Sequence, residues 1–485
     1  MYLKDLLIDV PEVLDVRGDV GVEIKALSAD SRKRLEQGMF FCFSGANFDA
    51  HDFAGQAVEN GSVALVVERY LPDVQAVQVR VSDGRAAMAR ISSAFHGHPD
   101  KRMRMVGVTG TKGKTTTTYL LKSICEAAGM KTGLIGTTGN MIGERMLESR
   151  LTTPDPIELY DTLHTMADEG VQVVCMEVSA HALALHKLVG MTFEAAAYTN
   201  LSLDHLDFFG TMEHYRDAKR MLFADGLCRN AAFNADEETT PAVMEGLALP
   251  CMTFGISENA DLYARDIEIT ENGVSFMLNL RGLHSAEIHL KMTGMFNVYN
   301  ALAATALAMI LGVDLETIKR GLEAVRSVPG RIEMLETNTP YRMILDYSHS
   351  PDALDNILRT VRTFTRGRLI ALFGCGGDRD RQKRPVMGRI SGQLADFSVL
   401  TSDNPRREDP MQILDAIEDG IRETNGAYVV IENRREAIRY AMSMAREGDV
   451  IVLCGKGHET YQDIGGVKHP FDEKIVVAEL LAQME

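Results

Sequence analysis

The stretch VGVTGTKGKTTTTYLL, residues 106–121, constrains the fold more than any other part of the sequence. A run of β-branched residues stops at a glycine-rich turn, and an apolar pattern with helical spacing follows Lys114. This order of strand, glycine loop and helix is typical of phosphate-binding loops, in which backbone N–H groups and the helix dipole approach phosphate oxygens. The spacing departs from G-x-x-x-x-G-K-[ST], because Val108 stands where that pattern has glycine. We therefore predict a nucleotide site with a shorter loop, against the alternative of a glycine-rich turn without a ligand.

The residues of this loop have side chains that suit a nucleoside triphosphate and its magnesium ion. In such loops the lysine neutralises the β- and γ-phosphates, and the hydroxyl after it reaches Mg²⁺. Lys114 and Thr115 occupy these two places. The loop residues that we expect to contact ATP are Gly110, Thr111, Lys112, Gly113, Lys114, Thr115 and Thr116.

Two further strand ends carry groups that could bind a metal ion. Glu177 ends the buried run VVCMEVSAH, and His205 lies between Asp204 and Asp207 in TNLSLDHLDFFG. A carboxylate at a strand tip beside a phosphate loop can hold Mg²⁺ directly or through water, and a histidine at the same edge can ligate a metal. Taken alone, a strand-end glutamate is more often solvated and a lone histidine is more often structural.

The length and the order of the predicted elements indicate three domains. A chain of 485 residues is too long for one ordinary core. Strands are predicted at 62–68 and 76–82 in the first block, and then strands and helices alternate from RMRMVGVTG onward as in βαβ units. The bounds that we predict are 1–100 for an N-terminal α/β domain, 101–330 for a central parallel-sheet domain, and 331–485 for a doubly wound, Rossmann-like domain.

Charge and cysteine usage exclude several classes of protein. The net charge of −17 and the pI near 5.3 argue against a nucleic-acid-binding protein, since phosphate neutralisation needs basic surface. The seven cysteines are scattered without a C-x-x-C pair, so neither a disulfide framework nor a zinc site is indicated. The N-terminus lacks a signal-peptide core and no run of 18 apolar residues occurs, so we expect a soluble cytoplasmic protein without membrane insertion.

The third block carries polar loops after several predicted strands. In the central block we predict strands at 131–138, 171–179 and 195–202, and the third block contributes YRMILDYSHSPDAL, GRLIALFGCGGDRD, FSVLTSDNPR, AYVVIE and DVIVLCGKGHE. Ligands of open α/β sheets gather at such carboxyl-end loops. The loops bring both signs of charge to one rim, which suits a zwitterionic ligand, although each could also be an ordinary turn.

Two other basic residues carry a weak signal by themselves. Lys219, in HYRDAK, is placed by its helix pattern as a surface lysine, and Arg331, in GRIE, stands at the junction of the second and third blocks.

Taken together, these motifs resemble the Mur ligases. The motifs GVTGTKGKTTTT, EVSAHAL, TNLSLDHLDFFG, HYRDAK, GMFNVYNALAA, GRIE, DYSHSPDAL, FGCGGDRDRQKRP, DNPR and GKGHE follow the order and rough spacing of that family from about residue 25 to the C-terminus. The pattern is most similar to the members that add the third residue of the peptidoglycan stem peptide. The resemblance implies a cytoplasmic, monomeric ligase that uses ATP and Mg²⁺ to join meso-2,6-diaminopimelate to UDP-N-acetylmuramoyl-L-alanyl-D-glutamate through an acyl phosphate.

The same resemblance implies roles for individual residues. It implies two Mg²⁺ ions, with Thr115 and Glu177 serving the ion on the ATP side, His205 serving the second, and a carbamylated Lys219 as a further metal ligand. It also adds Asn297, Arg331 and Asp346 to the ATP site. The residues implied for the UDP-linked dipeptide are Ser31, Ala46, Asn47, Phe48, Thr152, Thr153, Ser179 and Lys187. Those implied for diaminopimelate are Arg379, Asp403, Asn404, Pro405, Arg406, Gly455 and Glu459.

Three positions depart from the family pattern. Lys112 replaces a frequent asparagine in the loop, and Leu185 and Lys187 stand where glutamine and arginine are common. Lysine offers a point charge without the bidentate fork of arginine. Three other functions stay open at this point: the lysine-adding relative, a folylpolyglutamate-type ligase, and a phosphate-loop switch that hydrolyses ATP without an acceptor.

Overall fold

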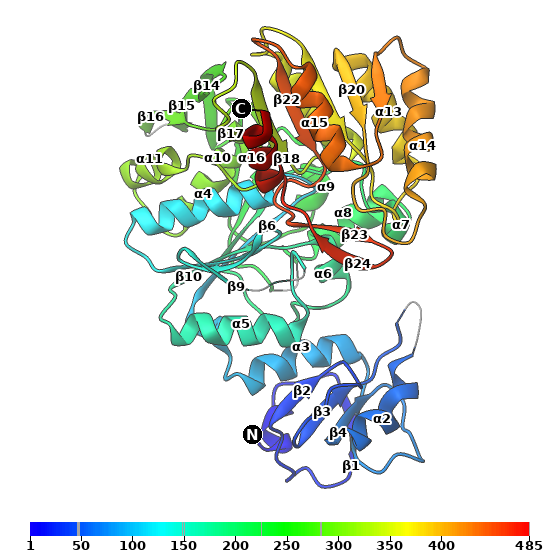
Figure 1. Ribbon diagram of the computed structural model, residues 1–485. Coiled ribbons are helices and arrows are strands. Elements are labelled where there is room, and N and C mark those ends of the chain that lie inside the picture. Colours follow the sequence, from blue (N-terminus) through cyan, green and yellow to red (C-terminus); the bar gives the residue numbers. More distant parts are fainter. Residues whose placement is uncertain (46–48, 148, 150, 225, 282–283, 485) are drawn as a thin grey trace.

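The computed structural model describes residues 1–45, 49–147, 149, 151–224, 226–281 and 284–484. Its strands form three large sheets and one short hairpin, and the sheets follow one another in space as they do along the chain (Figure 1). The N-terminal sheet lies at one end, the 11-stranded sheet in the middle and the last sheet at the other end. The predicted α/β class is confirmed, while the domain bounds at residues 100 and 330 stay a prediction.

The N-terminal unit is built on a five-stranded sheet in the order β1-β5-β4-β3-β2, in which only β1 is antiparallel to its neighbour. The strands predicted at 62–68 and 76–82 are present as β4 and β5. The elements are α1 (Leu3–Leu6), β1 (Val13–Arg17), β2 (Ala26–Ser28), β3 (Gly38–Phe41), η1 (Ala50–Phe53), α2 (Ala54–Glu59), β4 (Ser62–Val67), β5 (Val77–Val81), α3 (Gly84–Phe95) and η2 (Pro99–Arg102).

The central unit contains the 11-stranded sheet, in the order β16-β15-β14-β13-β12-β11-β6-β10-β7-β8-β9. Strands β7, β10, β6, β11, β12, β13 and β14 run parallel, and antiparallel strands extend the sheet at both edges. Its strands are β6 (Arg104–Thr109), β7 (Thr132–Gly136), β8 (Gly139–Ile142), β9 (Arg145–Leu147), β10 (Val173–Glu177), β11 (Ala195–Tyr198), β12 (Ala231–Asn234), β13 (Cys251–Gly255), β14 (Leu262–Thr270), β15 (Gly273–Leu280) and β16 (His284–Leu290).

Helices cover both faces of this sheet, because successive strand residues point to opposite sides. Val106 and Cys175 pack in one core with residues of α4 and α10, whereas Met105 and Met176 pack in the other core with residues of α5. The helices are α4 (Lys114–Ala127), α5 (Pro156–Asp168), α6 (Ala180–Ala184), α7 (Leu206–Phe209), α8 (Met212–Arg220), α9 (Thr240–Met244), α10 (Met295–Ile310) and α11 (Leu315–Ala324).

The C-terminal unit is a doubly wound sheet in the order β17-β18-β22-β19-β20-β21, parallel except for β17. A hairpin of β23 and β24 follows the last parallel strand. The elements are β17 (Glu333–Leu335), β18 (Arg342–Asp346), α12 (Pro351–Arg362), β19 (Leu369–Phe373), α13 (Lys383–Leu394), β20 (Phe397–Leu400), α14 (Pro410–Arg422), β21 (Tyr428–Val430), α15 (Arg434–Met444), β22 (Val450–Cys454), β23 (Tyr461–Ile464), β24 (Val467–Pro470) and α16 (Glu473–Met484).

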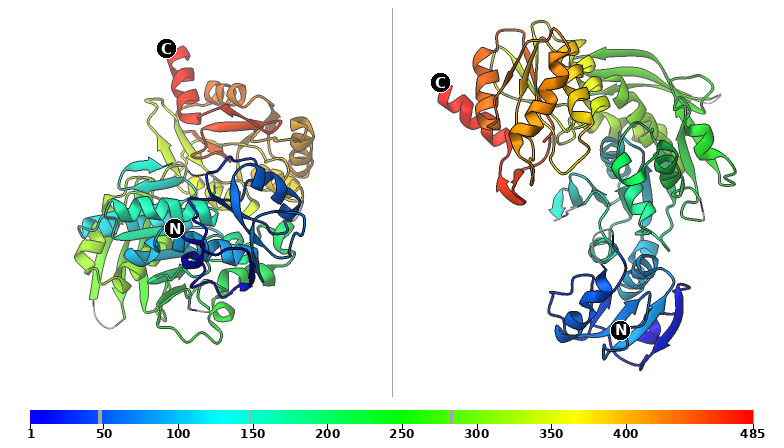
Figure 2. Two further views of the ribbon diagram at one scale, coloured as in Figure 1. Left: turned by 90° about the horizontal axis from the view of Figure 1, so that it is seen from below. Right: turned by 90° about the vertical axis from the view of Figure 1, so that its right-hand side faces the viewer.

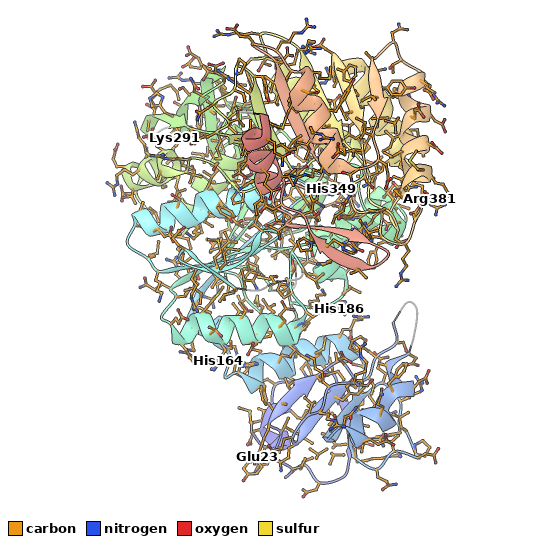
Figure 3. The ribbon with its side chains drawn as sticks, viewed as in Figure 1. Glu23, His164, His186, Lys291, His349 and Arg381 are labelled. Atoms are coloured by element: carbon orange, nitrogen blue, oxygen red, sulfur yellow. The ribbon has the colours of Figure 1, made fainter. Side chains whose placement is uncertain are left out.

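The three units are joined by specific contacts. Figure 2 shows the N-terminal unit projecting from the rest, with its α3 packed against α5 of the central unit. His186, labelled in Figure 3, lies at this junction, where its Nδ1 is 2.5 Å from Asp83 Oδ2. The C-terminal unit contacts the central one through an ion pair of 2.7 Å between Arg342 and Glu271. Within the described residues, no helix has both the length and the apolar character needed to cross a bilayer.

Candidate active site

The loop between β6 and α4 has the geometry of a phosphate-binding loop. Gly110 and Gly113 have φ of 152° and 86°, in the region that favours glycine. A Cβ atom at Gly110 would lie 1.9 Å from Thr199 Oγ1, and one at Gly113 would lie 2.4 Å from Asn300 Oδ1. Both positions therefore require glycine. The first N–H groups of α4 have no acceptor within the helix, so they point at the place where a phosphate would sit.

Lys114 folds back over this loop. Its ammonium donates to the carbonyl oxygens of Gly110 and Thr111, each at 2.9 Å. Burial lowers the pKa of Lys114, and the nearby Glu177 carboxylate opposes this shift. The lysine is thus held beside the loop as a preorganised donor, which is what a transferring phosphoryl group requires.

Glu177 lies beside the loop at the end of β10, which pairs directly with β6. The carboxylate is fully buried and accepts hydrogen bonds from the N–H and the hydroxyl of Thr137, at 2.9 and 3.0 Å. Thr137 also contacts the Thr152 hydroxyl at 3.0 Å. Thr153 donates to the carbonyl of Glu177 at 2.8 Å and accepts from the N–H of Ser179 at 3.0 Å. The structure therefore brings Glu177 together with three residues that were implied for the peptide substrate.

Lys219 lies on α8 and is only 1% exposed, so its interpretation as a surface lysine was wrong. The helix pattern missed this burial because α6 and α7 both pack against α8. The Nζ of Lys219 is 4.1 Å from the centre of the Tyr215 ring and has no ion pair or hydrogen bond within the described residues. Burial and the Lys114 ammonium lower the pKa of Lys219 well below its usual range, against the effect of Asp204.

His205 also lies beside Tyr215, with 5.9 Å between the two ring centres, and has a left-handed backbone with φ of 55°. Its ring is 4.7 Å from that of His181, and its Nε2 is 3.6 Å from Asp204. Burial and the neighbouring His205 lower the pKa of His181 to about 4. The side chain of His205 is nearly half-exposed, so it is open to a ligand.

The C-terminal unit contributes directly to the phosphate-loop site. Arg331 Nη2 donates to the Thr115 hydroxyl at 3.3 Å, and the guanidinium lies 5.1 Å from the Tyr347 ring centre. Asp346, at the end of β18, accepts from the N–H of Ile332 at 2.9 Å and so orients the segment that carries Arg331. Lys112 of the loop also reaches Asp352 on α12, at 3.7 Å.

Two more loops of the C-terminal unit meet beside this junction. Asn404 donates to Glu459 at 2.8 Å, and the fully buried Lys456 contacts Asn404 and Glu459 at 3.1 and 3.2 Å. Asp403 lies against Gly455, where a Cβ would approach its carboxylate to 2.9 Å. The loops after β20 and β22 therefore form one polar cluster of both charge signs.

Arg406 lies at the rim of this cluster. Its Nη1 donates to the Gly377 carbonyl at 2.7 Å, and its backbone N–H donates to the carbonyl of Asp463 in the β23–β24 hairpin at 2.9 Å. Glu408 does not pair with it, since Glu408 is bound by Arg384 and Arg381 and by the N–H of Asp378. Asp409 caps α14 through the N–H of Met411. The guanidinium of Arg406 thus keeps donors for a ligand, and the alternative of a local ion pair with these two acids is wrong.

The remaining predicted residues lie farther from this centre. Arg379 is exposed and donates to the carbonyl of Asp378. Ser31 donates to Gln56 at 2.7 Å in the N-terminal unit, and Lys187 pairs with Asp155 at 2.8 Å. The predicted contacts at Ala46, Asn47 and Phe48 lie outside the described residues.

Several residues that shape the site escaped the sequence analysis. Asn200 accepts from the N–H groups of Thr111 and Lys112, through its carbonyl and side-chain oxygens, both at 2.9 Å. Asn297, which was predicted, donates to the Thr293 carbonyl and accepts from Asn300, the residue that abuts Gly113. A polar pair directly after a buried strand, as in TNLS, was the available signal for Asn200.

The side chains beside the phosphate loop fit a Mg²⁺ ion whose coordination is completed by substrate phosphates and water. They do not fit a metal ion coordinated entirely by protein groups. Within the described chain, no group of three or more His, Cys, Asp or Glu side chains is placed to bind a metal ion. Thr115 and Glu177 offer one hydroxyl and one carboxylate beside the phosphate loop. Mg²⁺ is usually bound by one or two carboxylates together with substrate phosphates and water.

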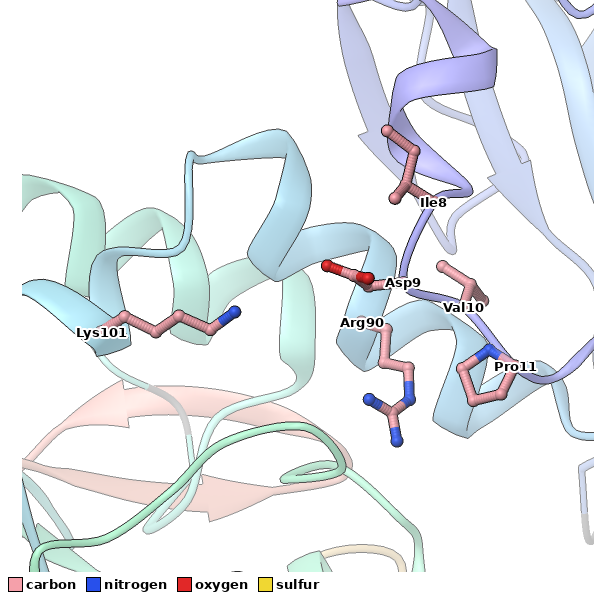
Figure 4. Close-up of a pocket in the computed structure, with 6 residues that line it drawn as sticks. All are labelled: Ile8, Asp9, Val10, Pro11, Arg90 and Lys101. Carbon is pink, nitrogen blue, oxygen red and sulfur yellow. The ribbon is translucent and has the colours of Figure 1, made fainter.

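A separate hollow of about 470 Å³ opens between the N-terminal segment 8–11, Arg90 of α3 and Lys101 of η2 (Figure 4). None of the predicted site residues lines it. The cluster around the phosphate loop therefore stands as the candidate active site on its chemistry, not on the size of its opening.

The loop geometry predicts a position-specific effect of adding one methyl group. Gly113→Ala is expected to impair ATP binding, because the new Cβ would overlap Asn300 Oδ1 in a backbone with positive φ. Gly129→Ala is the matched control, since Gly129 has φ of 78° and no neighbouring atom lies within 4 Å of the place that its Cβ would take. Calorimetric ATP titration of both variants is the measurement. Equal ATP affinity in the two variants would contradict the expected overlap between a Cβ at position 113 and Asn300 Oδ1.

Comparison with known proteins identifies the family. Residues 108–308 match the Mur ligase middle domain, and residues 330–457 match the Mur ligase, glutamate ligase domain. The chain is 44% identical to UDP-N-acetylmuramoyl-L-alanyl-D-glutamate–2,6-diaminopimelate ligase 1 of Clostridium acetobutylicum, with 100% of both chains covered.

Solved structures agree with these matches. A structure of UDP-N-acetylmuramoyl-L-alanyl-D-glutamate–2,6-diaminopimelate ligase superposes with a TM-score of 0.70 at 31% identity, covering 100% of this chain and 99% of the other. The MurF ligase of Thermotoga maritima in complex with ADP shares the fold, with a TM-score of 0.61 at 17% identity and coverage of 95% and 99%. The phosphate loop, the strand-end acid and the charged loops of the last sheet thus occur in a chain that belongs to the Mur ligase family.

Proposed function

We propose that this chain is an ATP-dependent, ADP-forming ligase that joins meso-2,6-diaminopimelate to UDP-N-acetylmuramoyl-L-alanyl-D-glutamate. The observation that carries the proposal is the contact of Arg331 with Thr115 at 3.3 Å. It joins the phosphate loop of one unit to the segment 330–331 of another, which packs against the loop 455–459 at Gly330. The site for phosphoryl transfer and the site for a zwitterionic amino acid therefore lie next to each other, where the central and C-terminal units meet. The full-length similarity to a diaminopimelate ligase supports the same activity.

The reaction needs two steps, because a carboxylate is a poor electrophile at neutral pH. In the first, a carboxylate oxygen of the D-glutamyl residue attacks the γ-phosphorus of ATP, which gives an acyl phosphate and ADP. In the second, the amine of diaminopimelate attacks the acyl carbon, and inorganic phosphate leaves with the bonding electrons. The amine loses one proton, and an amide remains. Both steps gather negative oxygens at one place, so fixed positive groups lower the barrier.

The residues of the chain divide this work. Lys114 would neutralise the transferring phosphoryl group, and Arg331 would approach the same phosphates from the C-terminal unit. Thr115 and Glu177 would hold an ATP-side Mg²⁺ and His205 a second one, and these ions would supply positive charge to the phosphate oxygens when bound. Thr152, Thr153 and Ser179, grouped around Glu177, would position the peptide end of the UDP-linked substrate.

We infer that the loops after β20 and β22 recognise diaminopimelate. Asp403, Asn404 and Glu459 offer acceptors for an ammonium group, and Arg406 offers donors for the distant carboxylate. Diaminopimelate has a distant carboxylate that lysine lacks, and a planar guanidinium that binds this carboxylate lets the enzyme distinguish the two amino acids. We also infer that the enzyme works as a monomer in the cytoplasm, because one chain supplies all the grouped residues and ATP is an intracellular substrate.

The decisive experiment measures phosphate release in the presence of ATP, with each other substrate supplied or omitted. Release should require both the UDP-linked dipeptide and diaminopimelate, and L-lysine should be a much poorer acceptor. Release without an acceptor would indicate a phosphate-loop switch. Release with a folate acceptor instead of the UDP-linked dipeptide would indicate a folylpolyglutamate-type ligase.

We propose in addition that Lys219 is carbamylated in the active enzyme. The buried ammonium has no anionic partner within the described residues, and a carbamate would replace it by a carboxylate-like metal ligand. In ¹³C-bicarbonate, the wild-type protein should show a carbamate resonance that Lys219→Gln lacks, and Lys219→Gln should lose activity. Lys122→Gln is the matched control, because Lys122 is also buried but is paired with Glu126 and Glu144. An active wild-type protein without the resonance would contradict the proposal.

A further inference from the structure

Arg434, the first residue of α15, is the largest fully buried side chain of the described protein. Its guanidinium spreads over three acceptors. Nε donates to Glu473 at 2.8 Å, Nη2 donates to the carbonyl of Cys454 at 2.8 Å, and Nη1 donates to the carbonyl of Ser402 at 3.3 Å. Cys454 is the last residue of β22, and Ser402 lies two residues beyond the end of β20. One side chain therefore holds the starts of both charged loops.

The sheet itself does not fix these two loops relative to each other. In the strand order β22-β19-β20, the strand β19 stands between them, so no ladder hydrogen bond joins β20 to β22. The two loops themselves contact each other beyond the strands through side chains, among them Lys456 with Asn404 at 3.1 Å. Farther out, a backbone bridge between Arg406 and Ile464 joins the loop after β20 to the β23–β24 hairpin. At the bases of the two loops, the planar guanidinium of Arg434, with its fixed donor directions, is a rigid connection across β19.

Packing stability alone does not explain this arrangement. A buried ion pair gains little over well-packed apolar residues, since both charges must leave water. Glu473 also keeps one buried oxygen, Oε2, without a hydrogen-bond partner in the described structure. Burial opposes the charged state, yet the carboxylates of Glu473 and Asp403 raise the pKa of Arg434 above its ordinary value. The guanidinium therefore stays charged close to Asp403, the first acid of the DNPR loop.

We propose that Arg434 is a positioning residue that sets the separation of the two amino-acid-binding loops, 402–406 and 455–459, and so tunes affinity for the incoming amino acid. The inference rests on the proposed function, because it assigns these loops to diaminopimelate. Glu473, at the start of α16, holds the guanidinium in its plane. Both residues are fully buried, so neither is placed to contact substrate, and neither belongs to the phosphate-loop site.

The test compares two variants with the wild-type enzyme. Arg434→Met with Glu473→Gln removes both charges together, so no buried charge is left unpaired. Arg434→Lys keeps the charge but lacks the fork that spans both carbonyls. Both should raise the KM for diaminopimelate by about tenfold, as expected when positioning of a bound group is loosened. The KM for ATP and for the UDP-linked dipeptide should stay unchanged, as should acyl-phosphate formation without the amino acid.

Arg368→Met is the matched control in the same sheet. Arg368 pairs with Asp449 at 2.7 Å and donates to the Met444 carbonyl, but it lies at the opposite edge, where β19 and β22 begin. It should lower the melting temperature without changing the KM for diaminopimelate. An equal KM increase in this control, or no increase in the Arg434 variants, would overturn the proposal. If the double variant fails to fold, Arg434→Lys decides.

The outcome separates the two proposals. A wild-type enzyme that does not use diaminopimelate would contradict the proposed function itself. A wild-type enzyme that uses it, with an unchanged KM in Arg434→Lys, would leave the function intact and refute the role of Arg434.

Discussion

Replacement of Lys114 by alanine is expected to reduce ligase turnover by a factor on the order of 10² to 10³ or more. The ammonium is buried at the phosphate loop and is already oriented by the Gly110 and Thr111 carbonyls. A donor held in this way costs no reorganisation when negative charge develops on the transferring phosphoryl group. Release of phosphate with all three substrates present is the measurement, and acyl-phosphate formation should be lost with it.

The fold should survive this substitution. The hydrogen bonds of the Lys114 ammonium go only to its own loop, and burial disfavours its charged form. Removing the ammonium should therefore have little effect on the stability of the fold. Lys131→Ala is a suitable control, because Lys131 directly precedes β7 of the same sheet and its half-exposed ammonium donates to the Glu169 carbonyl. A folded Lys114→Ala protein with near-normal turnover would remove the loop from the mechanism.

Replacement of Arg406 by alanine should chiefly change the choice of amino acid. We expect the preference for meso-diaminopimelate over L-lysine, as a ratio of kcat/KM, to fall by about 10²-fold. This is the factor that corresponds to one lost hydrogen-bonded charge pair of ~3 kcal/mol. The KM for diaminopimelate should rise and the KM for ATP should change little, because Arg406 binds the Gly377 turn and not the phosphate loop.

The neighbouring arginine supplies the control for this prediction. Arg407 follows Arg406 in sequence but is exposed to solvent, so Arg407→Ala has the same charge change without the recognition contact. Steady-state kinetics with both amino acids should distinguish the two variants. If wild-type enzyme used L-lysine as efficiently as diaminopimelate, the assignment of Arg406 would fail although the ligase assignment could stand.

Strands and their polar ends were predicted well from the sequence. The strands expected at 131–138, 171–179 and 195–202 are present as β7, β10 and β11. Each observed strand is shorter than the predicted run. β11 ends at Tyr198 because Thr199 and Asn200 leave the sheet and bind the phosphate loop, with Thr199 donating to the Lys112 carbonyl at 2.7 Å. From the sequence alone, a polar residue directly after a strand cannot be distinguished from the strand itself, because its hydrogen-bond partner in the loop is not visible in the pattern.

The burial of single charged residues was not predictable in the same way. Lys219 and Arg434 both stand in helices with polar patterns, and both are almost completely buried. Hydrophobic periodicity describes the face that a helix turns toward one sheet. It contains no information on a second element, such as α7 against α8 or α16 against α15, that arrives from elsewhere in the chain.

The sequence by itself determined the local order of this protein: buried strands that end in glycine or polar turns, a helix after Lys114, and parallel sheets in succession. These features follow from interactions between residues close in the chain, which the pattern records. Only the tertiary structure decided which loops share a site. Thr115 and Arg331 are 216 residues apart and meet at 3.3 Å, and Ser402 and Cys454 meet on one guanidinium. Such distances depend on how the three large sheets pack against their helices and against one another, which the contacts of distant residues set together.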